Sequence, residues 1–144
     1  MGLDVVISES LLSALQEKAD NWQDKLTILS NKIGEDARKN AVLEAPHKTG
    51  NLEQHMKLDS TGPYSSVVYP DENASPYALF VILGTGPHLI TGNPWLSWPG
   101  AKHPVRSVMH PGTAANPFLD RASDLTESDA EDRLAEFEAW VNDI

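Results

Sequence analysis

Residues 77–90, YALFVILGTGPHLI, mark the point in the sequence where an apolar segment ends and the chain changes direction. Seven apolar residues run without a break and then stop at a glycine-rich corner, Gly84–Pro87. Ser75 precedes the run and could cap a short helix, but a buried strand suits an apolar run of this length equally well. Either element would be followed by a change of direction at the glycines.

The corner itself has three interpretations: a phosphate cradle, a turn in the backbone, or an assembly contact. A phosphate-binding loop needs wider glycine spacing, a lysine and a following helix. Here Pro87 and strand-like residues follow, and no lysine is near. We therefore interpret Gly84 and Gly86 as residues that permit a corner with positive φ after a buried segment.

Upstream of this stretch, residues 8–44 are predicted to form one long helix. Apolar residues recur there at three- and four-residue steps, with a serine at the start as a cap and Pro46 after the end. Gly34 interrupts the stripe and could mark a bend. The stripe consists of Trp22, Leu26, Leu29, Ile33, Ala37 and Ala41.

Between the helix and residue 77, the pattern predicts two strands. Leu52, Gln54, Met56 and Leu58 alternate with polar residues, which indicates a half-buried strand. A turn at 61–63 and a second short strand at 64–70 follow.

Downstream, residues 84–116 are rich in proline and glycine and predict a long extended loop with brief strands. Asn116 and Pro117 are typical of a helix start, as N-cap and first helical position. Ser128 with Glu131 forms a capping box, so we expect a second helix to begin there. The apolar positions expected to face inward are Ala130, Leu134, Phe137 and Val141.

These elements predict an α+β fold in which a long N-terminal helix and a C-terminal helix pack on a small antiparallel β-sheet with a long extended loop. The length of 144 residues suits a single domain, which we assign to residues 1–144.

Composition and charge narrow the possible functions. The chain has no cysteine, which excludes disulfides, zinc–thiolate sites and thiol catalysis. A net charge of −10 argues against free-standing nucleic-acid binding. No apolar run approaches the roughly 18 residues that cross a bilayer, so no membrane partner is expected.

The sequence contains no recognisable catalytic or metal-binding pattern. The five histidines lack the helical spacing of a zinc protease, and no nucleophile elbow is present. Trp95 and Trp98 lie in a proline-rich loop and could stack on a ligand, pack in the core or anchor a neighbouring subunit. We predict no catalytic, cofactor or metal residues, and keep a small hydrolase using the loop histidines and a monomeric binding module using Trp95 and Trp98 as alternatives.

Three motifs, in this order after a long first helix, resemble the HK97 gp10-like family of tailed-bacteriophage neck and tail-completion proteins. They are APHKTGNL (45–52), SPYALFVILGTGPHLI (75–90) and HPGTAANPFLDRA (110–122), and a final helix follows them. The resemblance implies a non-enzymatic structural protein of the virion, located at the head–tail joint and assembled in the host bacterial cytoplasm.

The resemblance also implies partners. It predicts a homo-oligomeric ring, a hexamer or alternatively a dodecamer, between a connector, stopper or adaptor protein and the tail tube or tail terminator protein. DNA would pass through the lumen without specific binding, and acids between Asp120 and Asp143 would face the channel or the ring exterior. The predicted contact residues are Lys48, Thr49, Gly84, Thr85, Trp95, Trp98, His110, Pro111 and Phe118.

Overall fold

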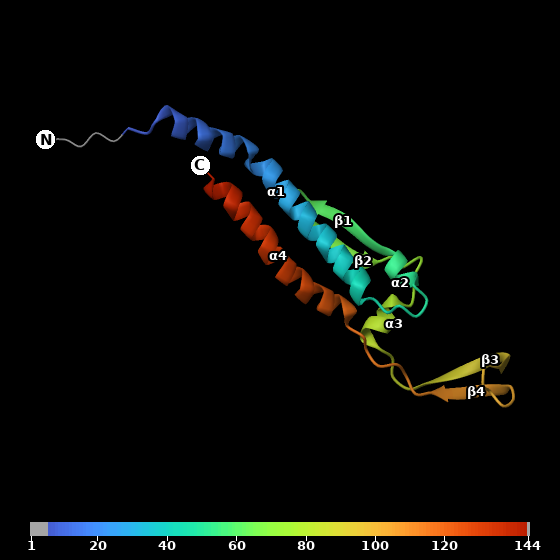
Figure 1. The fold of residues 1–144 in the computed structure, drawn as a ribbon. Helices are drawn as coiled ribbons and strands as arrows, with labels where there is room; N and C mark the ends of the chain where they lie inside the picture. Colours follow the sequence, from blue (N-terminus) through green and yellow to red (C-terminus); the bar gives the residue numbers. More distant parts are fainter. Residues whose placement is uncertain (1–5, 144) are drawn as a thin grey trace.

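The computed structural model describes residues 6–143 and shows an elongated α+β molecule (Figure 1). Two long helices lie side by side, a β-hairpin packs on the first of them, and a second β-hairpin projects from one end. The elements are α1 (Glu9–Glu44), α2 (Asn51–Gln54), β1 (Met56–Gly62), β2 (Ser65–Pro70), α3 (Ala78–Leu83), β3 (His88–Leu96), β4 (Val105–His110) and α4 (Phe118–Asn142).

Helix α1 confirms the prediction for residues 8–44. The hydroxyl of Ser8 accepts a hydrogen bond from the amide of Leu11 at 3.3 Å, which caps the first turn. The helix ends at Ala45, whose extended backbone is the conformation expected before Pro46. Gly34 serves close packing, since a Cβ there would lie 2.8 Å from the hydroxyl of Ser66 on β2.

Helix α4 corrects two predictions about the C-terminal region. The helix is continuous from Phe118 to Asn142, so no second helix begins at Ser128. No glycine or proline lies within this range, so nothing stops the first helix before the capping box. The N-cap position is Pro117, and the side chain of Asn116 instead accepts a hydrogen bond from Arg121 at 2.8 Å.

The first predicted strand is shorter than expected. Residues 51–54 form the single helical turn α2, and β1 begins only at Met56. Leu52 and Met56 are both buried, and their spacing of four residues suits a helical turn as well as strand alternation. The turn starts after Gly50, whose φ of 70° redirects the chain as it leaves α1.

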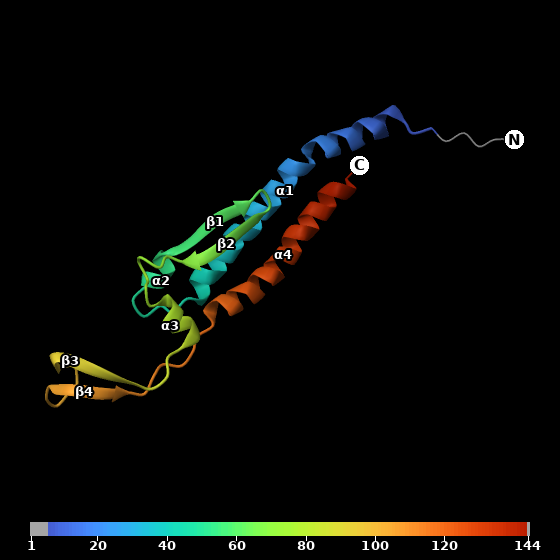
Figure 2. The ribbon, with the colours of Figure 1, turned by 180° about the vertical axis from the view of Figure 1, so that it is seen from behind.

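The strands form two separate two-stranded antiparallel sheets, not the single sheet that the sequence predicted. Strands β1 and β2 pair from Met56–Pro70 to Gly62–Ser65 and pack on α1, which α4 also contacts (Figure 2). Strands β3 and β4 pair from His88–His110 to Leu96–Val105. The predicted long loop is therefore largely a hairpin, because its apolar segments pair with each other.

The apolar run at 77–83 is helical, which decides between the two interpretations of that stretch. Helix α3 ends at Gly84, whose φ is 73°. Only Ala78 of this helix is buried, while Leu79, Phe80 and Leu83 are exposed. A six-residue helix on the surface cannot bury a run that is apolar on every side.

The core is small and lies where α1, α2, α3 and the start of α4 meet. Phe118 is its largest fully buried side chain. The core residues are Ala41, Ala45, Leu52, Met56, Ala78, Phe118 and Ala122. No residue of β3 or β4 is among them, so the projecting hairpin contributes no buried residue to the core.

Two further contacts join α1 to α4 along their length. The guanidinium of Arg133 donates to both carboxylate oxygens of Asp36, at 2.9 and 3.2 Å, and holds the pKa of Asp36 below its ordinary value. Nearer the helix ends, Trp22 packs edge-on against Phe137 and also contacts Trp140. Leu134, predicted to face inward, is 46% exposed.

Across residues 6–143, every helix falls short of the combined length and apolar character that a membrane span requires.

Candidate functional site

The projecting hairpin is the feature that the core leaves unexplained. We call residues 87–111, which contain β3 and β4, the arm. The arm points away from the two long helices at the end of the molecule opposite the N-terminus (Figures 1 and 2). An isolated two-stranded hairpin is marginally stable in water, because it has no second layer on which to bury a face.

Two glycine–threonine pairs join at the root of the arm and fix its direction. The backbone groups of Thr85 and Thr113 exchange two hydrogen bonds, each 2.9 Å long. Gly112 has a φ of 89°, and a Cβ there would lie 2.2 Å from the carbonyl oxygen of Thr85. Gly84 approaches the carbonyl oxygen of Thr113 almost as closely. We call this junction the clamp.

The clamp explains why the sequence carries a Gly-Thr pair at both 84–85 and 112–113. Only glycine permits both the positive φ and the close backbone approach found there. The amides of Thr85 and Thr113 each donate to the carbonyl oxygen of the other residue, so they are not arranged as a phosphate cradle. The interpretation of Gly84 as a corner is confirmed by its positive φ, but the same interpretation is wrong for Gly86, whose φ is not positive.

Next to the clamp, His88 and His110 face each other across the hairpin. Their ring centroids are 5.0 Å apart. The Nδ1 atom of His88 lies 2.8 Å from the carbonyl oxygen of Gly86, and the amide of Gly112 donates to Nδ1 of His110 at 3.0 Å. Each ring therefore bonds to the backbone two residues away and supports the turn at its own strand end.

The polar groups that this histidine pair contacts belong to the backbone. Within residues 6–143, no three histidine, aspartate or glutamate side chains gather where they could hold a metal ion. In that same part of the chain, the hydrogen bonds of His88 and His110 go to backbone atoms and not to a carboxylate that would orient the ring as a base.

The surface of the arm and of α3 carries large apolar side chains. Leu89 and Met109 are paired across the strands and are 60% and 63% exposed. Trp95 and Trp98, near the tip, are also about half exposed. Leu79, Phe80 and Leu83 of α3 are exposed as well, at 60%, 60% and 67%. Large exposed apolar patches mark sites of protein–protein contact.

The arm also differs in charge from the rest of the chain. Residues 84–116 contain no aspartate or glutamate, although the whole chain has a net charge of −10. Their only lysine and arginine are Lys102 and Arg106. The guanidinium of Arg106 lies 5.2 Å from the ring centroid of Trp95, in cation–π contact. The arm is thus a basic, apolar extension of an acidic molecule.

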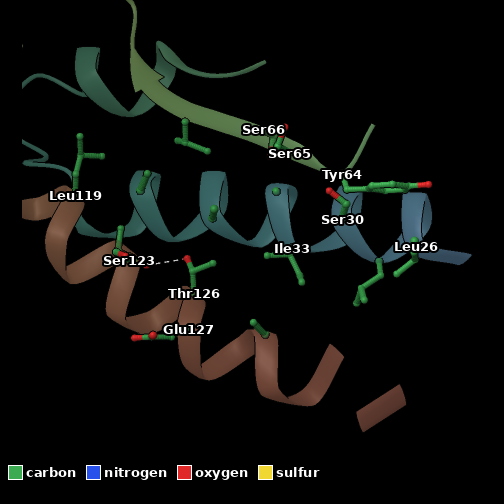
Figure 3. A pocket seen from close by; sticks show the side chains of 17 residues that line it. Leu26, Ser30, Ile33, Tyr64, Ser65, Ser66, Leu119, Ser123, Thr126 and Glu127 are labelled. Atoms are coloured by element: carbon green, nitrogen blue, oxygen red, sulfur yellow. Dashed lines mark hydrogen bonds between the residues drawn. The ribbon is translucent and has the colours of Figure 1, made fainter. Parts of the chain in front are cut away.

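On the body, a groove of about 730 Å³ lies between α1, α4 and β2 (Figure 3). We call it the α1–α4 groove. Three small residues of α1, namely Gly34, Ala37 and Ala41, are among those that line it. Its walls carry Leu26, Leu29, Ile33, Tyr64, Val68 and Leu119, so the lining is predominantly apolar.

The predicted contact residues fall into three groups in space. Gly84, Thr85, His110 and Pro111 meet at the root of the arm. Trp95 and Trp98 are exposed near its tip, and Lys48 and Thr49 are exposed in the loop before α2. Phe118 is corrected: its side chain is 0% exposed and belongs to the core, so it is not a surface contact.

Sequence reasoning missed the exposed residues of α3 and the pair of Leu89 and Met109. The run at 77–83 was expected to be buried because it is apolar throughout. Its shortness as a helix, with one face on the core, was the signal that most of it stays on the surface.

The comparisons with known proteins add no relative: no protein-family model, no curated protein and no solved structure matches the chain.

Proposed function

We propose that the protein is a structural virion protein of a tailed bacteriophage, which forms a ring at the head–tail interface and joins the connector to the tail tube. The three motifs that resemble the neck and tail-completion family support the phage assignment. The observation that carries the structural role is the arm, which exposes Leu89, Trp95, Trp98 and Met109 and shares no core with the body.

The physical argument is that an arm of this kind needs a partner surface. Covering apolar surface releases about 25 cal/mol for each Å² removed from water. A hairpin already folded in its bound shape also loses little conformational entropy when it docks. Repeated contacts between identical copies, each using one surface as donor and another as acceptor, close into a ring when the rotation between copies permits it.

The proposed partners are other copies of this chain, a connector, stopper or adaptor protein above the ring, and the tail tube or tail terminator protein below it. DNA would pass through the ring without specific binding, in keeping with the acidic body. Six copies are the expected ring, with twelve as the alternative.

Native mass spectrometry tests this function, first on the chain alone and then with the connector protein of the same phage added. A closed oligomer in either sample, of six or twelve copies, is the expected result. A chain that stays monomeric with its connector present contradicts the proposal, as does turnover of a substrate by the isolated monomer.

A second candidate, a monomeric binding module, has one observation in its favour: Trp95 is half exposed and stacked by Arg106. Such a pair could hold a planar ligand. Retained monomeric mass together with ligand binding at this pair would favour that function over ring formation.

A further inference from the structure

We propose that the arm of one copy docks in the α1–α4 groove of the next copy. This inference rests on the proposed function, since it names the two surfaces through which the ring would form. It joins two features that no other part of residues 6–143 covers: an apolar projection and an apolar recess.

The arm does not fill the groove of its own chain, because the clamp fixes its direction. The clamp holds both strands at the root with two backbone hydrogen bonds between Thr85 and Thr113. The backbone is closely packed there, since a Cβ at Gly84 or Gly112 would lie 2.6 or 2.2 Å from a carbonyl oxygen of the opposite segment. The arm leaves the body in the direction away from the helices that form the groove (Figures 1 and 2). A second copy must therefore supply the arm.

The length of the groove can be compared with the length of the arm. The groove follows α1 from Leu26 to Ala41, a length of about 22 Å at 1.5 Å per helical residue. Strand β3 has nine residues and spans about 30 Å. Strand β3 is therefore long enough to run the full length of the groove. The volume of the groove, about 730 Å³, is large enough to receive large side chains.

The arm and the edge of the groove carry opposite charges. Asp120, Asp124, Glu127 and Glu131 recur at three- and four-residue spacing and so follow one side of α4. Glu127 lines the groove, which places this acidic row along its edge. All four side chains are exposed. The arm brings Lys102 and Arg106 and no acid.

Two other acids of α4 already have partners within the described chain, whereas this row does not. Asp129 accepts a hydrogen bond from Asn40, and Glu136 pairs with Lys32 at 3.5 Å. Within the part of the chain that the structure describes, no hydrogen bond or ion pair involves a side chain of the acidic row. A basic partner beside the groove would form ion pairs with this acidic row. The other acids of α4 would stay on the exterior of the ring or on its lumen side.

Disulfide trapping tests the inference directly, because the natural chain has no cysteine. Ser97→Cys places a thiol between the two tryptophans of the arm without removing either. Ser123→Cys places one in the groove. The two variants, one carrying a size tag, are mixed and oxidised mildly. The matched control replaces the second variant with Ser128→Cys, which lies on the same helix but outside the groove.

We expect the mixed disulfide to form several-fold more with Ser123→Cys than with Ser128→Cys. A double variant, S97C with S123C, should give a ladder of covalent oligomers up to the full ring. Arg106→Glu should lower the mixed yield about fivefold, and Glu127→Arg on the partner should restore it. Equal yields at positions 123 and 128, or arm-to-arm disulfides only, overturn the inference.

The same samples separate this inference from the proposed function. Oligomers seen by native mass spectrometry without the arm–groove disulfide overturn the arm–groove contact and leave ring formation standing. No oligomer and no disulfide overturn both. Protection of the introduced arm thiol by double-stranded DNA, and not by a second copy, would make the arm a nucleic-acid contact and would also overturn the inference.

Discussion

Gly112 lies where the returning strand of the arm passes the backbone of Thr85, and it has the least room of any glycine in the described chain. An alanine there would combine a φ of 89° with a Cβ 2.2 Å from a carbonyl oxygen. Such backbone strain costs about 1–3 kcal/mol even before the clash is counted. The simplest relief is to break the hydrogen bonds of the clamp.

We therefore predict that Gly112→Ala accelerates hydrogen exchange of the Thr85 and Thr113 amides by about tenfold or more, as a loss of that size implies. Gly86→Ala is the control, because nothing lies within 4 Å of the position where its Cβ would be. Unchanged exchange in Gly112→Ala would show that the clamp does not hold the arm.

The ion pair of Asp36 and Arg133 predicts a dependence of stability on pH. Arg133 lowers the pKa of Asp36 below 3.8, so the pair stabilises the fold fully above that pH. Its contribution is lost as pH falls from 3.8 toward the lower pKa of the folded state. Asp36→Asn should lower the melting temperature at pH 7, and the difference from wild type should shrink below about pH 4.

Thermal unfolding between pH 2.5 and 7 measures this effect. Glu35→Gln is the control, since Glu35 pairs with Arg38 on the exposed face of α1. A difference for Asp36→Asn that stays constant across this range would contradict the role given to the charge.

At the scale of elements, the exposure of two phenylalanines distinguishes the core from the surface. Phe118 is fully buried at the start of α4, and Phe80 is 60% exposed on α3. Phe118→Ala should cost about 3–5 kcal/mol of unfolding free energy, because it removes the largest side chain of a small core. Phe80→Ala should stay within about 0.5 kcal/mol of wild type. Urea denaturation of the monomer compares them, and similar losses for both would contradict the assignment of the core.

The elements also show what the sequence could predict. The boundaries of α1 follow from local signals, a serine cap and a proline stop, and the structure confirms them. The capping box at Ser128 is an equally local signal, yet α4 continues through it, because a cap acts only where the chain enters a helix. The division into two sheets depends on which strands meet, and alternation does not encode strand pairing.

For the candidate site, the sequence placed the corner at Gly84 and Trp98 correctly outside strands, but Trp95, predicted to lie in a loop, belongs to β3. The sequence also could not show that Gly84–Thr85 meets Gly112–Thr113. The contact of Thr85 with Thr113 joins residues far apart in the chain. The exposure of Trp95 and the burial of Phe118 also depend on tertiary packing, which composition does not report.

At the scale of the whole molecule, we expect the unfolding free energy of the body to be independent of the arm. The core contains no residue of β3 or β4. Replacing residues 88–110 with a short glycine–serine linker should therefore leave the thermal unfolding of the body nearly unchanged and abolish oligomer formation. Scanning calorimetry and native mass spectrometry measure the two effects on one sample. Oligomers that persist without the arm would place the contact elsewhere, for instance on α3.

The central claim is that this chain acts by shape, as one of several identical copies that enclose the path between head and tail. Cryo-electron microscopy of the purified phage particle that carries the chain tests this claim most directly. The account predicts a closed ring of six or twelve copies at the head–tail joint, with every arm covered by a neighbouring subunit. Absence of the chain from the purified particle, or arms left exposed to solvent in the assembled neck, would contradict it.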